Sequence, residues 1–120
     1  MIPISDKLFY DLTEMTTTIT TRDDPIEQKH QKKISDYLDK AKFITIKIVS
    51  ANKTGWPDIF ALDPYGQLWA IEVKRSRNGV VSRLQHTRLA MLKENKAVPM
   101  VAWGFEDFKT KYELLIGLRK

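Results

Sequence analysis

Apolar residues recur along the chain with two different spacings, which separate helical segments from strands. From residue 25 to about residue 40 the spacing is helical, because Ile34, Tyr37, Leu38 and Ala41 lie three or four positions apart. Asp24-Pro25 is a typical helix start, with a capping Asp followed by Pro at the first helical position. Lysines fill most of the positions between, so we expect the opposite face of this helix to be solvated.

Runs of β-branched and aromatic residues predict four strands, at residues 43–49, 58–62, 67–75 and 98–103. Asp63-Pro64-Tyr65-Gly66 predicts a tight turn between the second and third strands. A second helix is expected from Ser82 to about Asn95, and a short helix after Phe105. Pro99 suits an edge strand or a bulge. The order helix, three strands, helix, strand predicts an α/β fold, with one mixed four-stranded sheet flanked by helices.

Composition narrows the class of protein. The 120 residues suit a single domain, in which residues 25–120 hold the predicted elements and residues 1–24 form an arm or a short helix. The absence of Cys excludes a disulfide framework, a thiolate nucleophile and a Cys-ligated zinc site. No signal peptide or membrane-spanning run is evident, so we expect a cytoplasmic protein, in the host cytoplasm if the source is viral. The net charge of +5 suits a polyanionic partner.

The predicted hairpin brings two carboxylates together. Asp58 and Glu72 are equally distant from Tyr65, so folding about Tyr65 places them opposite each other, with Cβ atoms about 4.5–5.5 Å apart. Two carboxylates so placed repel each other unless a cation lies between them, and a hard cation such as Mg²⁺ takes oxygen ligands. Lys74 shares the face of Glu72, where its ammonium can act on an attacking water and on a phosphate.

An ordinary explanation of these residues stays open. Glu72 and Lys74 would then be an exposed ion pair on a solvated strand, since Pro-Asp followed by Glu-x-Lys also occurs by chance. The surrounding sequence favours a site. Glu72 and Lys74 end an apolar strand that is expected to be buried on both faces, and charges at the end of such a strand lie at the rim of the sheet.

Two more polar residues are candidates for the site, each with a structural alternative. Glu27 stands three residues after Asp24, which is the position of a capping-box acid, but it also shares a helix face with Ile34 and Leu38. Gln85 stands three residues after Ser82, in a second capping box, and shares a face with Leu89 and Leu92. We expect Glu27 to point inward and Gln85 to line the site or contact a phosphate.

Basic residues surround the proposed site in sequence. They are expected to contact backbone phosphates, which gives salt-sensitive affinity, and the alternative is a solvated basic face. The candidate DNA-binding residues are Arg75, Arg77, Ser82, Arg83 and Arg88. His30 and His86 are expected to be partly exposed helical residues rather than general bases.

Three motifs in order resemble a known family. They are Gly55-Trp56-Pro57-Asp58, Ala70-Ile71-Glu72-Val73-Lys74 and Ser82-Arg83-Leu84-Gln85. Together they resemble the VRR-NUC domain, the virus-type replication-repair nuclease branch of the PD-(D/E)XK superfamily, whose pattern also has an upstream helical Glu that Glu27 matches. The resemblance covers roughly residues 25–103. Family members often carry Gly after the second helix, where this chain has Asn95, a residue that can adopt a left-handed conformation.

The resemblance implies a restriction-endonuclease-like core and hydrolysis of DNA phosphodiesters with Mg²⁺ or Mn²⁺. It implies Asp58, Glu72 and the Val73 carbonyl as metal ligands, Glu27 as a further acidic residue, and Lys74 acting on the attacking water. Stand-alone members resemble phage or bacterial proteins and are associated with branched DNA, so we expect a structure-selective endonuclease of repair or recombination, acting on substrates such as Holliday junctions.

Other functions stay open at this stage. The alternatives are a flap or single-strand nuclease, and a module that binds nucleic acid without cutting it. A homodimer would match a two-fold junction, formed through residues 1–24 or the exposed edge of the fourth strand.

Overall fold

The computed structural model describes residues 25–48, 55–75 and 79–118. In chain order the elements are helix α2 (Pro25–Lys40), strands β1 (Ile44–Lys47), β2 (Ile59–Leu62) and β3 (Leu68–Lys74), helix α3 (Arg83–Glu94), strand β4 (Val98–Trp103) and helix α4 (Phe105–Leu118). The predicted order is confirmed, with β1 and β3 shorter than expected and α4 longer. The predicted arm at residues 1–24, the capping Asp24, Val49 and Arg77 lie outside the described residues.

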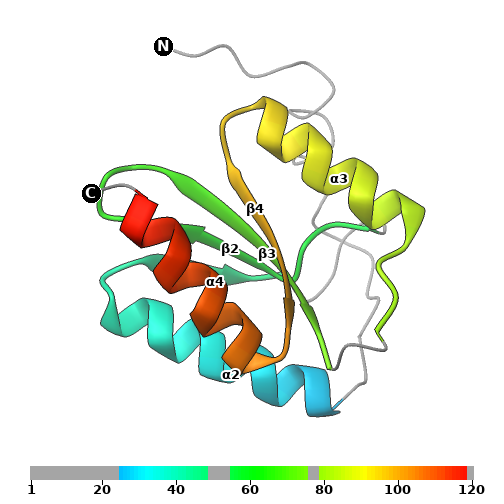
Figure 1. The fold of residues 1–120 in the computed structure, drawn as a ribbon, viewed down its shortest axis with the longest axis horizontal. Helices are drawn as coiled ribbons and strands as arrows, with labels where there is room; N and C mark the ends of the chain where they lie inside the picture. The colour runs from blue at the N-terminus through cyan, green and yellow to red at the C-terminus, as the bar shows by residue number, and fades with distance from the viewer. Residues whose placement is uncertain (1–24, 49–54, 76–78, 119–120) are drawn as a thin grey trace.

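The strands form one sheet in the order β1-β2-β3-β4. β2 is antiparallel to both β1 and β3, whereas β4 runs parallel to β3, so the sheet is mixed as predicted. Helix α3 covers one face, and α2 and α4 lie together on the other (Figure 1). None of the described helices is long and apolar enough to cross a membrane.

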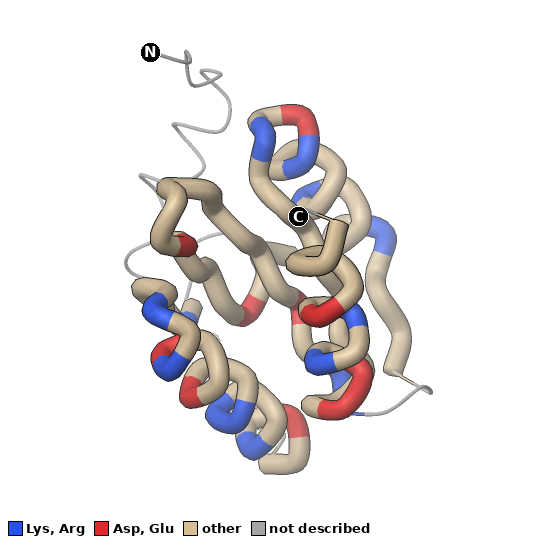
Figure 2. Tube along the Cα trace, turned by 60° about the vertical axis from the view of Figure 1, so that its left-hand side comes forward, with Lys and Arg blue, Asp and Glu red and all other residues tan. Residues whose placement is uncertain are grey.

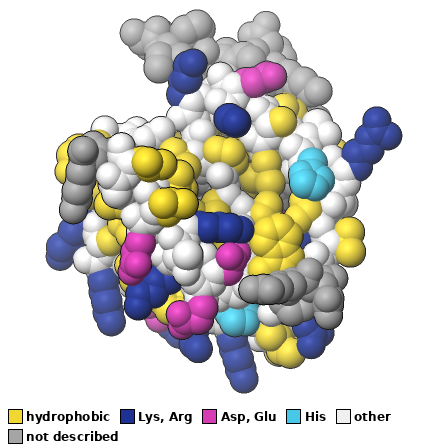
Figure 3. Space-filling model, viewed as in Figure 1, with side chains coloured by type: hydrophobic (Ala, Val, Ile, Leu, Met, Phe, Trp, Pro, Cys, Tyr) yellow, Lys and Arg dark blue, Asp and Glu magenta, His cyan; other side chains and the backbone are white. Residues whose placement is uncertain are grey.

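Charge lies on the outer surfaces of the helices. Three lysines of α2, Lys29, Lys32 and Lys33, are exposed, and Figure 2 shows both basic and acidic positions on the helices. Lysine and arginine side chains also project around the periphery of the face shown in Figure 3. In the part of the chain that the structure describes, basic side chains therefore lie on several elements rather than in one cluster.

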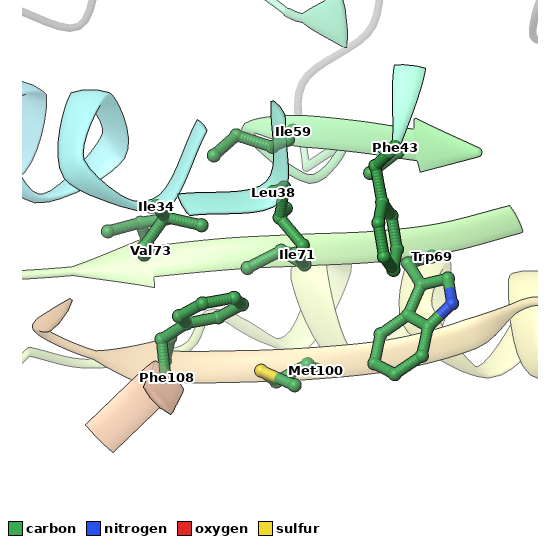
Figure 4. Packing of buried hydrophobic residues seen from close by; sticks show 11 residues of the cluster. Ile34, Leu38, Phe43, Ile59, Trp69, Ile71, Val73, Met100 and Phe108 are labelled. Carbon is green, nitrogen blue, oxygen red and sulfur yellow. The ribbon is translucent and has the colours of Figure 1, made fainter. Parts of the chain in front are cut away.

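The larger core lies between the sheet and the helices α2 and α4. Ile34 packs beside Val73, Leu38 beside Ile71, and Phe43 beside Trp69, all buried (Figure 4). Phe108 of α4 closes this layer, together with Tyr37 and Tyr112, in a cluster of aromatic rings whose centroids are 5.3–5.7 Å apart. Because Ile34 lies over Val73, the first turns of α2 extend toward the end of β3 that carries Glu72 and Lys74.

The smaller core lies under α3. Phe60 and Ala70 of the sheet pack with Leu92 and Ala97, and Trp56 belongs to the same cluster. β3 is thus buried on both faces, with Trp69, Ile71 and Val73 on the α2 side and Ala70 on the α3 side. This confirms both the predicted burial and the predicted alternation, which places Glu72 and Lys74 on the α3 face.

Helix α3 begins and ends with defined caps. At its start, Ser82 and Gln85 form the predicted capping box. At its end, the expectation of a left-handed Asn95 is wrong, because Asn95 has φ −94° and the left-handed residue is Lys96, with φ 71°. The amide of Lys96 donates to Lys93 and that of Ala97 to Leu92, as in a Schellman motif. In that motif the left-handed residue comes one position after the cap, which is why Lys96 takes this conformation.

Helix α4 closes the outer edge of β4. In the parallel ladder the backbone groups of Val101 and Trp103 point away from β3. The Val101 carbonyl accepts a bond of 2.6 Å from Lys111 Nζ, and the Trp103 amide donates to Asp107 Oδ2 at 2.9 Å. Pro99 has no N–H to present there. Pro99 is therefore on an edge strand, as predicted, and side chains of α4 occupy two backbone groups of this edge. Whether this edge joins two copies stays a prediction.

A histidine of α2 forms a hydrogen bond with the start of α4. His30 is half-buried, and its Nδ1 accepts a hydrogen bond of 2.9 Å from the backbone amide of Phe105, the first residue of α4. A Cβ at Gly104, whose φ is +89°, would lie 3.3 Å from the imidazole. His30 thus satisfies one of the unpaired amides at a helix start, which gives it a structural role.

Candidate active site

The β2–β3 hairpin has the predicted register. Ile59 pairs with Ile71 and Ala61 with Trp69, so the hairpin folds about Tyr65, and extending this register by one residue sets Asp58 against Glu72. The turn is fixed by Asp63, whose Oδ1 accepts from the amides of Tyr65 and Gln67, both at 2.9 Å. Its Oδ2 accepts from Trp69 Nε1 at 3.0 Å. The spacing of the two site carboxylates is therefore set by a local turn.

Both site carboxylates are buried. Asp58 is 2% exposed and Glu72 is 0% exposed. A buried carboxylate requires donors or cations in place of water. The alternative of an exposed pair on a solvated strand is wrong, since the Glu72 side chain is 1% exposed and the Lys74 side chain only 12%.

Pro57 ends the β2–β3 ladder at the site. The register places residue 57 opposite Val73, where an ordinary residue would exchange two backbone hydrogen bonds with it. Pro57 has no N–H to donate to the Val73 carbonyl. The Val73 amide instead donates to Asp58 Oδ2 at 2.7 Å. This bond orients the Asp58 carboxylate, and the Pro-Asp sequence places the Val73 carbonyl beside it without the usual ladder donor.

Gln85 connects the other two residues of the site. Its Nε2 donates to Glu72 Oε2 at 2.6 Å, and its Oε1 accepts from Lys74 Nζ at 3.1 Å. The same Oε1 accepts from the Ser82 amide at 2.9 Å, which is one half of the capping box. Lys74 Nζ also lies 3.4 Å from Glu72 Oε2. The structure thus brings Glu72, Lys74 and Gln85 together, and Gln85 both caps α3 and lines the site.

Glu27 lies in the first turn of α2 and is half-buried. That turn lies toward the site end of the sheet, because α2 packs Ile34 over Val73 two turns later (Figure 4). Among the residues that the structure describes, however, no three His, Asp or Glu side chains are grouped to hold a metal ion. The structure therefore does not gather Glu27 with Asp58 and Glu72, and its role as a ligand stays a prediction.

The candidate DNA-binding residues differ in exposure. Arg75, Ser82 and Arg83 are exposed at the start of α3 and the end of β3. Arg88 is only 8% exposed, and its guanidinium carbon lies 4.6 Å from the centroid of the Trp56 ring. This packing was not predicted, although the sequence carries a signal for it. Arg88 falls on the same spacing as the other buried residues of α3, which are Gln85, Leu89 and Leu92.

The donor set of the site suits a hard divalent cation. The carboxylates of Asp58 and Glu72 and the carbonyl of Val73 all offer oxygen, and the described part of the chain offers no sulfur ligand there. A carboxylate has about four lone-pair positions, so the bond from Val73 leaves Asp58 able to ligate a metal. Oxygen ligands of this kind favour Mg²⁺ or Mn²⁺ over Zn²⁺ or Cu²⁺.

Comparison with solved structures identifies the fold. No family model and no curated protein matches this sequence. One similar structure is described as a "VRR_NUC domain", with a TM-score of 0.67 and 22% identity, covering 73% of this chain and 95% of that one. Another is a "VRR_NUC domain protein", with a TM-score of 0.61 and 20% identity, covering 79% of this chain and 91% of that one. The chain therefore has the restriction-endonuclease-like α/β fold of VRR_NUC domain structures, as the sequence motifs predicted.

The bridging role of Gln85 makes a prediction about stability. Gln85→Leu should lower the free energy of unfolding by about 3 kcal/mol, because it leaves Glu72 buried without its amide donor. Ser82→Ala is the matched control, since it removes a bond of the same capping box without touching Glu72, and should cost about 1 kcal/mol. Urea denaturation measures both. Equal losses in the two variants would mean that Gln85 serves the helix cap alone.

Proposed function

We propose that this protein is a metal-dependent endonuclease that hydrolyses DNA phosphodiester bonds. The observation that carries the proposal is the buried pair Asp58 and Glu72, opposed at the end of a hairpin, with Lys74 held beside Glu72 by Gln85. Two buried carboxylates that oppose each other repel, and a divalent cation bound between them would remove that repulsion. The fold, shared with VRR_NUC domain structures, supports the same conclusion by analogy.

Asp58, Glu72 and the Val73 carbonyl would hold Mg²⁺ or Mn²⁺, and Glu27, in the first turn of α2, is a candidate for a further carboxylate. When bound, the cation would supply Lewis-acid stabilisation of the charge that develops on the phosphate. The protein's part is to fix the ligands before substrate arrives. The Val73 amide does this for Asp58, and Gln85 Nε2 does it for Glu72.

Lys74 is the candidate for handling the attacking water. Gln85 Oε1 and Glu72 Oε2 hold its ammonium at 3.1 and 3.4 Å, so it is oriented within the site. An ammonium in that position orients the water and stabilises negative charge on the phosphate. No reorganisation free energy is needed at the moment of reaction, because the Lys74 side chain is already oriented.

The DNA would be held mainly through its phosphates. Arg75, Ser82 and Arg83 are exposed near the site, and Arg77 is a further candidate in the same stretch of sequence. Such contacts position a duplex without reading its bases, so shape is the remaining source of selectivity. We therefore favour branched DNA, such as a Holliday junction, as the substrate. A homodimer would match the junction's two-fold symmetry.

A module that binds nucleic acid without cutting it is the main competing function. It would need neither a half-buried lysine beside Glu72 nor a glutamine that fixes both of these charges. A flap or single-strand nuclease would use the same chemistry on another DNA shape, so it is distinguished by substrate and not by the site.

Removing either carboxylate should abolish cleavage. Asp58→Asn and Glu72→Gln keep the shape of each side chain but remove the charge that serves the cation, so DNA binding in Ca²⁺ should change little. Single-turnover cleavage of a labelled four-way junction in Mg²⁺, with a binding assay in Ca²⁺, measures both. Near wild-type cleavage by either variant would show that the site lies elsewhere.

Replacing Lys74 should separate metal binding from catalysis. Lys74→Met keeps the aliphatic stem and should reduce the rate at saturating Mg²⁺ by at least about 100-fold, the low end for a positioned proton-transfer group. Titration calorimetry with Mn²⁺ should find the metal still bound. If metal affinity fell while the rate at saturating metal survived, Lys74 would have a structural role only.

The shape of the substrate should matter more than its sequence. We expect a four-way junction to be cut faster than a linear duplex of the same sequence, with little change when the bases at the branch are altered. A gel assay would compare a junction, a flap and a linear duplex at one salt concentration, because affinity depends steeply on salt. Equal rates on all three, or cutting confined to one short sequence, would contradict this part of the proposal.

A further inference from the structure

Arg88 is buried at a place where an arginine is unusual. It belongs to the second turn of α3 and is 8% exposed, whereas Arg83 and Arg75 are exposed. Its guanidinium carbon lies 4.6 Å from the centroid of the Trp56 ring, in the geometry of a cation–π contact. A side chain in this position is directed into the protein rather than toward a phosphate on the surface.

Trp56 is held by packing. It is 3% exposed, and its indole N–H has no hydrogen-bond partner within the described residues. Buried indoles usually find such a partner, so the ring depends on its neighbours for its position. The neighbour that stacks on it is Arg88, whose Nη1 also contacts the Met91 sulfur at 3.8 Å.

The position of Trp56 bears on the position of Asp58. Only Pro57, with its fixed φ, separates them, so a shift of Trp56 is transmitted to the Asp58 backbone. Gly55, with φ +90°, lies so close to α3 that a Cβ there would be 2.6 Å from Leu84 Cγ. The segment before Asp58 is thus pressed against α3 at two adjacent points, Leu84 and Arg88.

The same two turns of α3 also hold the other half of the site. Gln85 follows Leu84 directly and bonds to Glu72 and Lys74. One rigid helix therefore contacts the supports of both carboxylates, Asp58 through Gly55 and Trp56, and Glu72 through Gln85. The separation of the two carboxylates depends on how firmly α3 holds the segment at residues 55–57.

We propose that Arg88 is a positioning residue of the site, whose stack on Trp56 fixes Asp58 at the separation from Glu72 that a divalent cation requires. The inference rests on the proposed function, since it assigns the pair to a metal. It gives Arg88 a role inside the protein in place of the phosphate contact expected from the sequence. A planar guanidinium stacks on an indole in a way that an ammonium does not, so lysine should not replace it.

The test uses Arg88→Lys and Arg88→Met, with Arg83→Met as the matched control on the exposed side of the same helix. Mn²⁺ affinity measured by calorimetry should fall about 10-fold or more in both Arg88 variants, as for other residues that orient metal ligands. The cleavage rate at saturating metal should change much less. Arg83→Met should keep the metal affinity and lose only DNA affinity.

A second measurement does not depend on metal or on cleavage. The Val73 amide is bonded to Asp58 Oδ2, so its hydrogen exchange reports how firmly Asp58 is held. In metal-free Arg88→Met, exchange at Val73 should accelerate relative to Ile71, which lies in the same strand and is bonded within the ladder. Trp56→Leu should give the same difference, because it removes the other half of the stack.

Two results would overturn the proposal. One is unchanged metal affinity in Arg88→Met, with weaker DNA binding and a shallower salt dependence, which would assign Arg88 to a phosphate. The other is a variant of either kind, Arg88→Met or Trp56→Leu, in which hydrogen exchange at Val73 does not accelerate relative to exchange at Ile71. If the wild-type protein bound no metal and cut no DNA, the proposed function would fail, and the exchange measurement would still decide whether Arg88 positions Asp58.

Discussion

The structure depends on how one buried carboxylate is satisfied. Glu72 lies in the most buried strand with 0% exposure, and such a group is tolerated only where donors and positive charge replace its water. Gln85 Nε2 and Lys74 Nζ supply these. Gln85 can reach Glu72 only if α3 begins at Arg83 and lies across this face of the sheet, so the capping box at Ser82 and the placement of α3 follow from the same requirement.

Much of the site could be predicted from the sequence because its geometry is local. The turn at residues 63–66 fixes the hairpin, and equal distances from Tyr65 then oppose Asp58 and Glu72 without any knowledge of the rest of the fold. Strand alternation puts Lys74 on the face of Glu72, and the three-residue spacing from Ser82 places Gln85 at the start of α3. Each of these inferences spans no more than one hairpin or one helix turn.

What could not be predicted depends on packing between distant segments. The burial of Arg88 against Trp56 joins residues 32 positions apart, and its basic character suggested a solvent-facing role. The full length of α4 follows from Phe108 and Tyr112 packing on Tyr37, a contact that no local pattern shows. The left-handed residue after α3 was misplaced by one position because Asn adopts this conformation more readily than Lys, whereas the hydrogen bonds of the helix end select Lys96.

The closed edge of β4 has a consequence for how the protein behaves at high concentration. Sheets polymerise when an outer strand offers a row of unpaired backbone groups to a second molecule. Here Lys111 and Asp107, from one turn of α4, each occupy one backbone group, the Val101 carbonyl and the Trp103 amide, and Pro99 has no N–H to donate. α4 thus hinders the addition of a further strand at this edge of the sheet. Fraying of that helix would create a template for aggregation, even if the hairpin and the site stayed intact.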